Sequence, residues 1–321
     1  MSKAKKVFII LAVVFIVIGL AMTGIAMMAA GFDFKNISTV SYETKFYEIK
    51  ESFDVINVDD IDCDIRLRLS ESNVCKVTVC DTVGMDHQVE VYDGALHVTS
   101  SDTRKWYERI GIFSWEDCEV VIELPETEYR STLLKTMSGD IEVADEISFE
   151  DAILISTSGN VLFNGEVKNE LTARSTSGEV VVEDIDTTYV NVESTSGDVK
   201  LSGISGFSAI AASTSGDVQL SDVNVKGLAV SSTSGDIDMD TVNVENKAEI
   251  EAVSGDIDFD AFDAGTIEIK TASGDVEGEI ITPKNFITDT SSGDVTVPVP
   301  DSSAGHCVIK TVSGDIKIEL D

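Results

Sequence analysis

The dipeptide Ser-Gly, usually followed by Asp, recurs ten times in this 321-residue chain at intervals of 19 to 21 residues. A fixed period of this size is typical of stacked repeat architectures. The ten glycines are Gly139, Gly159, Gly178, Gly197, Gly216, Gly235, Gly255, Gly274, Gly293 and Gly314. The repeat therefore constrains the whole C-terminal part of the chain, and its uniformity argues against a single specialised catalytic residue.

Apolar residues alternate with polar ones on both sides of each Ser-Gly. The second residue after each glycine is always apolar, the fourth is apolar in nine repeats, and the third residue before it is always small. This period-2 pattern, rich in β-branched residues, predicts two short strands per repeat. We expect the glycine to give the bend its freedom of φ, and the small residues, mostly hydroxylic, to stack in ladders.

Strands this short bury an apolar face only when coil stacks upon coil. The sequence thus predicts an all-β fold, a single-stranded parallel β-helix (a β-solenoid) with coils of about 19 residues, right-handed by the crossover rule. Residues 131–321 form the regular β-helix of ten Ser-Gly-Asp repeats. Residues 51–130 are strand-like without the period, which is typical of terminal coils and a cap.

The chain is strongly acidic, with 58 Asp and Glu against 23 Lys and Arg and a formal net charge of −35. Such a surface repels phosphate backbones, so nucleic acid is excluded as a partner.

An uncharged, largely apolar stretch lies near the N-terminus, from Val7 to Ala30. It is long enough to predict a transmembrane helix over residues 7–30, although a cleaved signal remains an alternative. The basic end, residues 1–6, predicts a cytoplasmic N-terminus. Residues 31–50 then form a spacer, and we expect a single-pass protein of the cell membrane with its ectodomain outside.

The chain resembles the bacterial putative-adhesin family over roughly residues 45–321. The resemblance rests on Phe53–Val58, Asp93–Val98, Val121–Pro125 and the Ser-Gly-Asp-apolar repeat that begins with Thr136–Ile141. It implies a β-helical domain of unknown function, with membrane-anchored members associated with envelope stress. It implies no catalytic residues, and fold alone does not establish function.

An acidic residue or Asn follows every turn glycine, and alternation places this column on the outside of the solenoid. Stacked like charges about 4.8 Å apart need compensation, either from turn amides or from cations. Because Ca²⁺ prefers several oxygen ligands, the densest part of the column is a candidate Ca²⁺ site, beside the alternative of a solvated acidic face. Its residues are Asp236, Asp238, Asp240, Asp256, Asp258 and Asp260.

An aromatic stretch interrupts a polar region and contains both tryptophans of the chain. Aromatic residues favour protein and membrane interfaces, so one interpretation is an interaction loop; the other is a cover over the open end of the solenoid. The candidate residues are Trp106, Tyr107, Ile110, Phe113 and Trp115.

Four of the five cysteines, Cys63, Cys75, Cys80 and Cys118, lie in the N-terminal part, where disulfide pairing is open and its connectivity cannot be read. Cys307 replaces an apolar residue of its repeat, which indicates a buried thiol.

These patterns favour a non-catalytic surface protein that mediates interaction or sensing at the cell envelope. Partners of an acidic rod are cationic peptides, wall polymers bridged by divalent cations, or other envelope proteins; no cofactor is indicated beyond the candidate Ca²⁺. One alternative is a polysaccharide-active β-helix enzyme, with Asp236 and Asp256 as a carboxylate pair. Another is a passive structural spacer.

Overall fold

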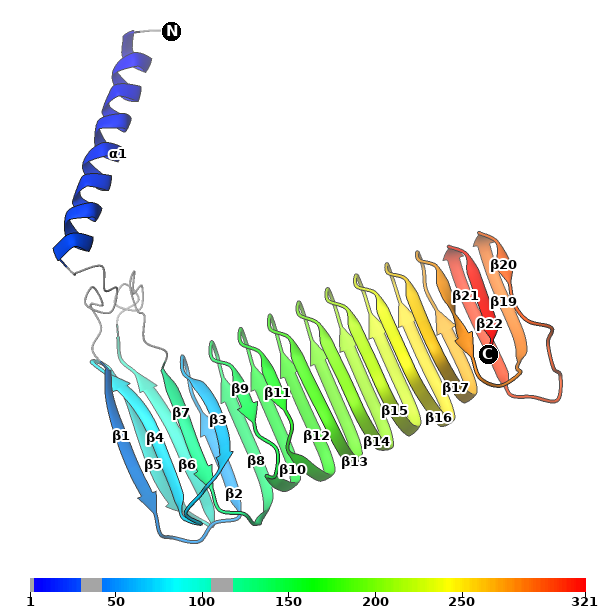
Figure 1. Cartoon of the computed structure of the whole chain (residues 1–321), viewed down its shortest axis with the longest axis horizontal. Helices are drawn as coiled ribbons and strands as arrows, with labels where there is room; N and C mark the ends of the chain where they lie inside the picture. Colours follow the sequence, from blue (N-terminus) through cyan, green and yellow to red (C-terminus); the bar gives the residue numbers. More distant parts are fainter. Residues whose placement is uncertain (1–2, 30–41, 105–117) are drawn as a thin grey trace.

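The structure is a computed structural model that describes residues 3–29, 42–104 and 118–321. The described chain contains one helix, α1 (Lys3–Ala29), and 22 strands (Figure 1). The strands stack side by side into a parallel β-solenoid of about 10 turns, which confirms the predicted all-β solenoid, whereas its predicted right-handed sense stays a prediction.

The strands are named here in chain order. Those before the first Ser-Gly are β1 (Tyr42–Ile49), β2 (Val55–Asp59), β3 (Asp64–Leu69), β4 (Cys75–Thr82), β5 (Met85–Tyr92), β6 (Ala95–Asp102), β7 (Glu119–Leu124) and β8 (Glu128–Thr136). Those after it are β9 (Ile141–Val143), β10 (Ser148–Ser156), β11 (Val161–Phe163), β12 (Glu166–Ser175), β13 (Val180–Ser194), β14 (Val199–Ser213), β15 (Val218–Ser232), β16 (Ile237–Ala252), β17 (Ile257–Lys270), β18 (Val276–Ile280), β19 (Asn285–Ser292), β20 (Val295–Thr296), β21 (His306–Ser313) and β22 (Ile316–Leu320).

The prediction of a transmembrane helix over residues 7–30 is wrong. In the described part of the chain, no helix has the length and apolar character needed to cross a membrane. The predicted localisation, a single-pass membrane protein with a cytoplasmic N-terminus and an external ectodomain, is therefore also wrong.

Each middle coil bends at the Ser-Gly-Asp turn and again within its strand. A second bend lies six residues after the glycine, where the backbone of a single residue is left-handed. The residues at this second bend are Asp184, Gly203, Asp222, Thr241 and Ala261. Inward and outward residues alternate on both sides of the second bend, and the alternation breaks again where two successive residues, Thr188 and Tyr189 of β13, both point outward. One continuous 15-residue strand therefore lines successive walls of the core.

The coil between Gly235 and Gly255 is longer by one residue and absorbs it in a bulge. Gly235 and Gly255 are 20 residues apart instead of 19, and the pairing of β16 with β17 shifts register between Val244 and Lys247. A bulge accepts an extra residue without moving the side chains on either side of it to the wrong face.

A serine ladder runs along the turns, as the sequence predicts. The Ser213 hydroxyl donates to the Gly197 carbonyl of the preceding coil at 2.9 Å and accepts the Gly216 N–H of its own turn at 2.9 Å. The same pair of bonds recurs at Ser156, Ser175, Ser194 and Ser232. The ladder therefore links consecutive coils at the edge of the core.

Replacing Ser213 with Ala should lower the free energy of unfolding by about 1–3 kcal/mol, because the buried N–H of Gly216 and the part-buried C=O of Gly197 both lose their partner. Thr214 is exposed and uses no side-chain bond in the ladder, so Thr214→Ala is the matched control and should change stability by about 0.5 kcal/mol or less. Urea unfolding of both variants measures the difference. Equal stabilities would contradict the ladder.

The turn glycines are needed for space and not, as predicted, for a positive φ. Nine of the ten have a negative φ, and Gly314 at 159° is close to extended. A Cβ on Gly216 would lie 2.3 Å from the Gly197 carbonyl oxygen, and the other repeats show similar distances. Consecutive turns therefore stack backbone on backbone, at a distance that only glycine allows.

The last two coils are stacked out of chain order. β21 pairs with β17 on one side and with β19 on the other, and β22 lies likewise between β18 and β20 (Figure 1). The backbone contacts of the turns follow this spatial order, since Gly314 stacks on Gly274 and Gly293 stacks on Gly314. Every Ser-Gly-Asp turn has the same chemistry, so the turns accept one another irrespective of their position in the chain.

The N-terminal end begins with a coil and continues as a cap. β2 and β3 pair in parallel with β8 and β9, and the Cys63-Asp64 turn occupies the place of a Ser-Gly-Asp turn beneath Gly139. The other strands at this end form antiparallel pairs: β1 with β4, β4 with β5 and β7, and β5 with β6. This mixed layer closes the end of the core.

Candidate functional site

The acidic column is largely architectural. The Asp198 carboxylate accepts the backbone N–H of Asp217 at 2.9 Å, and the Asp217 carboxylate accepts that of Asp236 at 2.9 Å. The ladder continues through Asp256 to Asp275. Turn amides thus compensate the stacked charges, one of the two possibilities that the sequence left open.

The six candidate aspartates divide between this ladder and an open groove. Asp236 and Asp256 each accept the amide of the next coil and belong to the ladder. The other four line a groove of about 740 Å³ on the outward face of β13–β18 and β22. Those four are Asp238, Asp240, Asp258 and Asp260.

The strand register brings the four groove aspartates together. Asp238 lies beside Asp258 and Asp240 beside Asp260 on the neighbouring strands β16 and β17. Partial burial raises the pKa of Asp238 and of Asp258, and neighbouring carboxylates raise both further. The groove thus gathers four carboxylates that repel one another, and its proposed occupation by Ca²⁺ stays a prediction.

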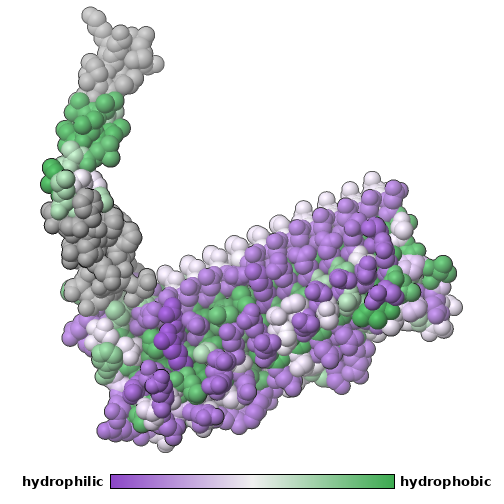
Figure 2. Space-filling model, viewed as in Figure 1, coloured by the Kyte–Doolittle hydropathy of each residue, from purple (hydrophilic) through white to green (hydrophobic). Residues whose placement is uncertain are grey.

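Basic residues stand only toward the two ends of the groove and are already paired. Lys200 lies 2.7 Å from Glu179, and Lys317 lies 3.7 Å from Glu319. Among the residues that the structure describes, no ion pair engages the four groove aspartates. Most of the face seen in Figure 2 is hydrophilic, with smaller hydrophobic areas between.

The predicted aromatic interaction residues lie outside the described part of the chain. Trp106, Tyr107, Ile110, Phe113 and Trp115 all fall within residues 105–117. Their role as an interaction loop or as a cover stays a prediction.

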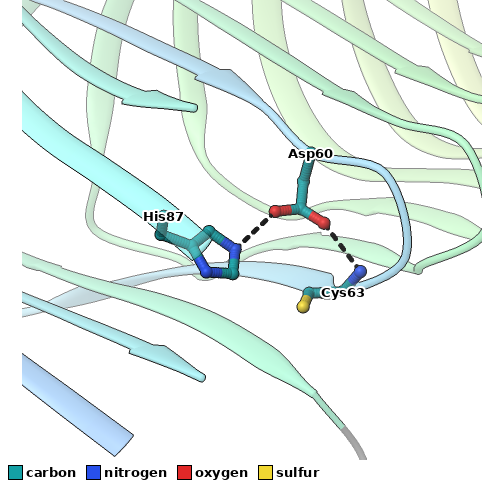
Figure 3. A group of neighbouring side chains, drawn as sticks. All are labelled: Asp60, Cys63 and His87. Atoms are coloured by element: carbon teal, nitrogen blue, oxygen red, sulfur yellow. Dashed lines mark hydrogen bonds and ion pairs between the residues drawn. The ribbon is translucent and has the colours of Figure 1, made fainter. Parts of the chain in front are cut away.

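A buried ionic cluster, which the sequence analysis missed, lies where the first coil meets the cap. The His87 ring stands between two carboxylates, with Nε2 2.7 Å from Asp60 and Nδ1 2.7 Å from Asp81 (Figure 3 shows His87 and Asp60). These three side chains are at most 4% exposed. Lys45 of β1 pairs with Asp81 at 2.5 Å, so the cluster joins β1, β4 and β5 to the first turn.

The two carboxylates hold the imidazole in its charged form. Burial alone would lower the pKa of His87, but the hydrogen bonds to Asp60 and Asp81 outweigh it and raise that pKa. Burial likewise opposes ionisation of both aspartates, yet bonds from His87 and, for Asp81, from Lys45 lower their pKa values. Both ring nitrogens face acceptors, so both carry protons.

The stability of the cap should therefore depend on pH. His87 makes its full contribution to the free energy of unfolding below its unfolded pKa, near 6.5. That contribution is lost as pH rises through its higher folded pKa. Asp60 and Asp81 stabilise the fold above their unfolded pKa, about 3.8. That stabilisation is lost as pH falls through their lower folded pKa values. Thermal unfolding followed from pH 3 to pH 9 should peak near pH 5 to 6. A profile equally high at pH 9 would contradict the charged His87.

Two cysteines of the N-terminal part are joined. Cys63, in the first turn, forms a disulfide with Cys118, which precedes β7. Cys75 and Cys307 are buried thiols, and burial raises the pKa of each to about 12. The prediction for Cys307 is confirmed.

The fold and its turns define the class of protein: a capped parallel β-solenoid with serine and aspartate ladders. The family model described as Toastrack DUF4097 matches residues 53–220 and 208–321. The chain belongs to this family, and the resemblance to putative adhesins is confirmed.

Several solved structures are similar to this chain at low identity. A putative adhesin from Bacteroides fragilis NCTC 9343 is 15% identical, with 87% of this chain and 97% of that chain covered and a TM-score of 0.43. A putative lipid binding protein from Parabacteroides distasonis ATCC 8503 is 15% identical, with coverages of 76% and 98% and a TM-score of 0.49. A putative adhesin from Parabacteroides merdae ATCC 43184 is 15% identical, with 76% of this chain and 98% of that chain covered and a TM-score of 0.48. The comparison with curated proteins gave no match.

Proposed function

We propose that the protein is a non-catalytic interaction protein that binds basic polypeptide segments in the groove over β13–β18. The observation that carries this proposal is the set of four neighbouring groove aspartates without an ion-pair partner among the described residues. A lysine or arginine side chain entering the groove supplies the missing charge and lowers the repulsion within it.

Two features support a binding role over a catalytic one. The carboxylate pair considered for glycan hydrolysis, Asp236 and Asp256, is bonded to backbone amides of the ladder. The buried cluster around His87 is closed to solvent, so no substrate reaches it.

A rigid row of similar sites suits an adhesin-like role. Exposed ion pairs are individually weak, but several made along one stiff surface add up to useful affinity. In this proposal the protein holds basic partners of a cell envelope by many such contacts, in contrast to a passive spacer, which holds none.

The proposal predicts salt-sensitive binding of a lysine-rich peptide that depends on the groove. Changing Asp238, Asp240, Asp258 and Asp260 to Asn should weaken binding by about fourfold or more, because exposed ion pairs contribute roughly 0.2–1 kcal/mol each. Fluorescence anisotropy at 20 and 300 mM salt measures the affinity.

The matched control removes acidic charge elsewhere. Glu166 and Glu170 are exposed on β12 and do not line the groove, so Glu166→Gln with Glu170→Gln should weaken binding by less than twofold after screening. If both sets of variants lose affinity in proportion to charge, binding belongs to the net charge and not to the groove.

A further inference from the structure

The buried cluster around His87 contains the donor set of a zinc site. One ligand atom each from Asp60, Cys63 and His87 lies within 4.8 Å of the other two, and all three residues are buried (Figure 3). The Cys63 sulfur is bonded to that of Cys118, so a second sulfur occupies the same place. Two sulfurs, one imidazole and one carboxylate are the number and kind of ligands that structural zinc takes.

We propose that reduction of the Cys63–Cys118 disulfide turns this cluster into a zinc site with four protein ligands: the two sulfurs, His87 Nε2 and Asp60 Oδ2. A thiol or phosphine reductant supplies two electrons and breaks the S–S bond, leaving two thiols. Zinc then replaces three protons, one from each thiol and one from Nε2. The disulfide and the zinc ion are alternative links between the first turn and the segment before β7.

The surroundings of the cluster already hold the ligands as a metal site requires. His87 Nδ1 donates to Asp81, which fixes the ring with Nε2 toward Asp60, and Lys45 holds Asp81 from the other side. Carboxylate–histidine pairs of this kind orient the imidazole in zinc proteins. The Asp60 Oδ1 accepts the backbone N–H groups of Asp62 and Cys63, which leaves Oδ2 directed at the ring.

The four proposed ligands come from three separate parts of the chain. Asp60 and Cys63 lie in the turn between β2 and β3, His87 in β5, and Cys118 just before β7. A closed set of four protein ligands leaves no position for substrate, so the ion would be structural and would secure the cap when no disulfide does.

The test is zinc binding by the full chain with and without a phosphine reductant, measured by competition with a chromophoric chelator. The reduced protein should bind one equivalent of Zn²⁺ and the oxidised protein none. Co²⁺ in place of zinc should give the visible and sulfur-to-metal absorption of a tetrahedral thiolate site in the reduced protein alone.

Variants separate this site from adventitious binding. Cys63→Ser should abolish the stoichiometric site, whereas Cys307→Ser, which removes a buried thiol of another coil, should leave it unchanged. Asp81→Asn keeps all four ligands but weakens the orientation of His87, and should lower zinc affinity about 10–100-fold. If the reduced chain loses its cap without metal, zinc added during refolding should restore the cap in wild type but not in Cys63→Ser.

Three results would overturn the proposal. The first is no zinc uptake by the reduced chain, whether zinc is added to the folded protein or during refolding. The second is equal uptake by the oxidised chain. The third is a site in Cys63→Ser with wild-type stoichiometry and affinity.

Discussion

Replacing Gly216 with Ala is expected to lower the free energy of unfolding by about 3 kcal/mol, the upper end of the usual cost of overpacking, because the atoms that the new Cβ meets are immobile. The added Cβ would stand 2.3 Å from the Gly197 carbonyl oxygen and 2.4 Å from its carbonyl carbon. These are backbone atoms held by the serine and aspartate ladders, so neither turn can move without breaking bonds to the next coil. Urea unfolding of the purified variant measures the loss.

Gly227 provides the matched control for this substitution. It lies within β15, and a Cβ built there meets nothing within 4 Å. Because Gly in a strand interior carries an entropic cost relative to Ala, Gly227→Ala should be neutral or stabilising by up to about 1 kcal/mol. If the two variants lose similar stability, the close stacking of the turns is not what selects glycine.

Replacing His87 with Leu is expected to lower the free energy of unfolding by about 3–5 kcal/mol, because it leaves two buried carboxylates without their shared cation. Asp60 and Asp81 each approach the ring at 2.7 Å and are almost fully buried. Thermal unfolding of the oxidised protein measures the loss. His306 is exposed, so His306→Ala should change stability by about 0.5 kcal/mol or less.

A second substitution tests the physical cause of that loss. Adding Asp60→Asn to the His87→Leu variant removes one of the uncompensated charges, and it should recover part of the lost stability. If the double variant is instead less stable than the single one by the full cost of Asp60→Asn alone, the two residues do not interact and the cluster account is wrong.

The solenoid followed from the sequence because its information is local and repeated. The apolar residues two and four positions after each glycine, and the small residue three before it, fix strand faces and the serine ladder within one coil. The prediction that the turn glycines are needed for a positive φ is wrong, because the clash that requires glycine involves the backbone of the neighbouring coil. The order of the last coils was not predictable, since β21 and β19 present the same turn to β17.

The candidate site was only partly predictable, because some of its contacts join residues of different coils or strands. Alternation placed Asp238 and Asp258 outward, and register made them neighbours, but the use of Asp236 in the ladder depends on an amide one coil away. The buried cluster joins Asp60, Asp81 and His87 from separate strands of the cap, which has no repeat. The transmembrane prediction rested on apolar length alone.

The most direct test of the account is hydrogen exchange of the full chain with and without the lysine-rich peptide, resolved to individual coils. Because the turn residues are architectural and the groove binds the peptide, added protection is expected over β14–β18 and none in the cap strands β4–β6. Protection spread evenly along the solenoid, or confined to the cap, would contradict the account.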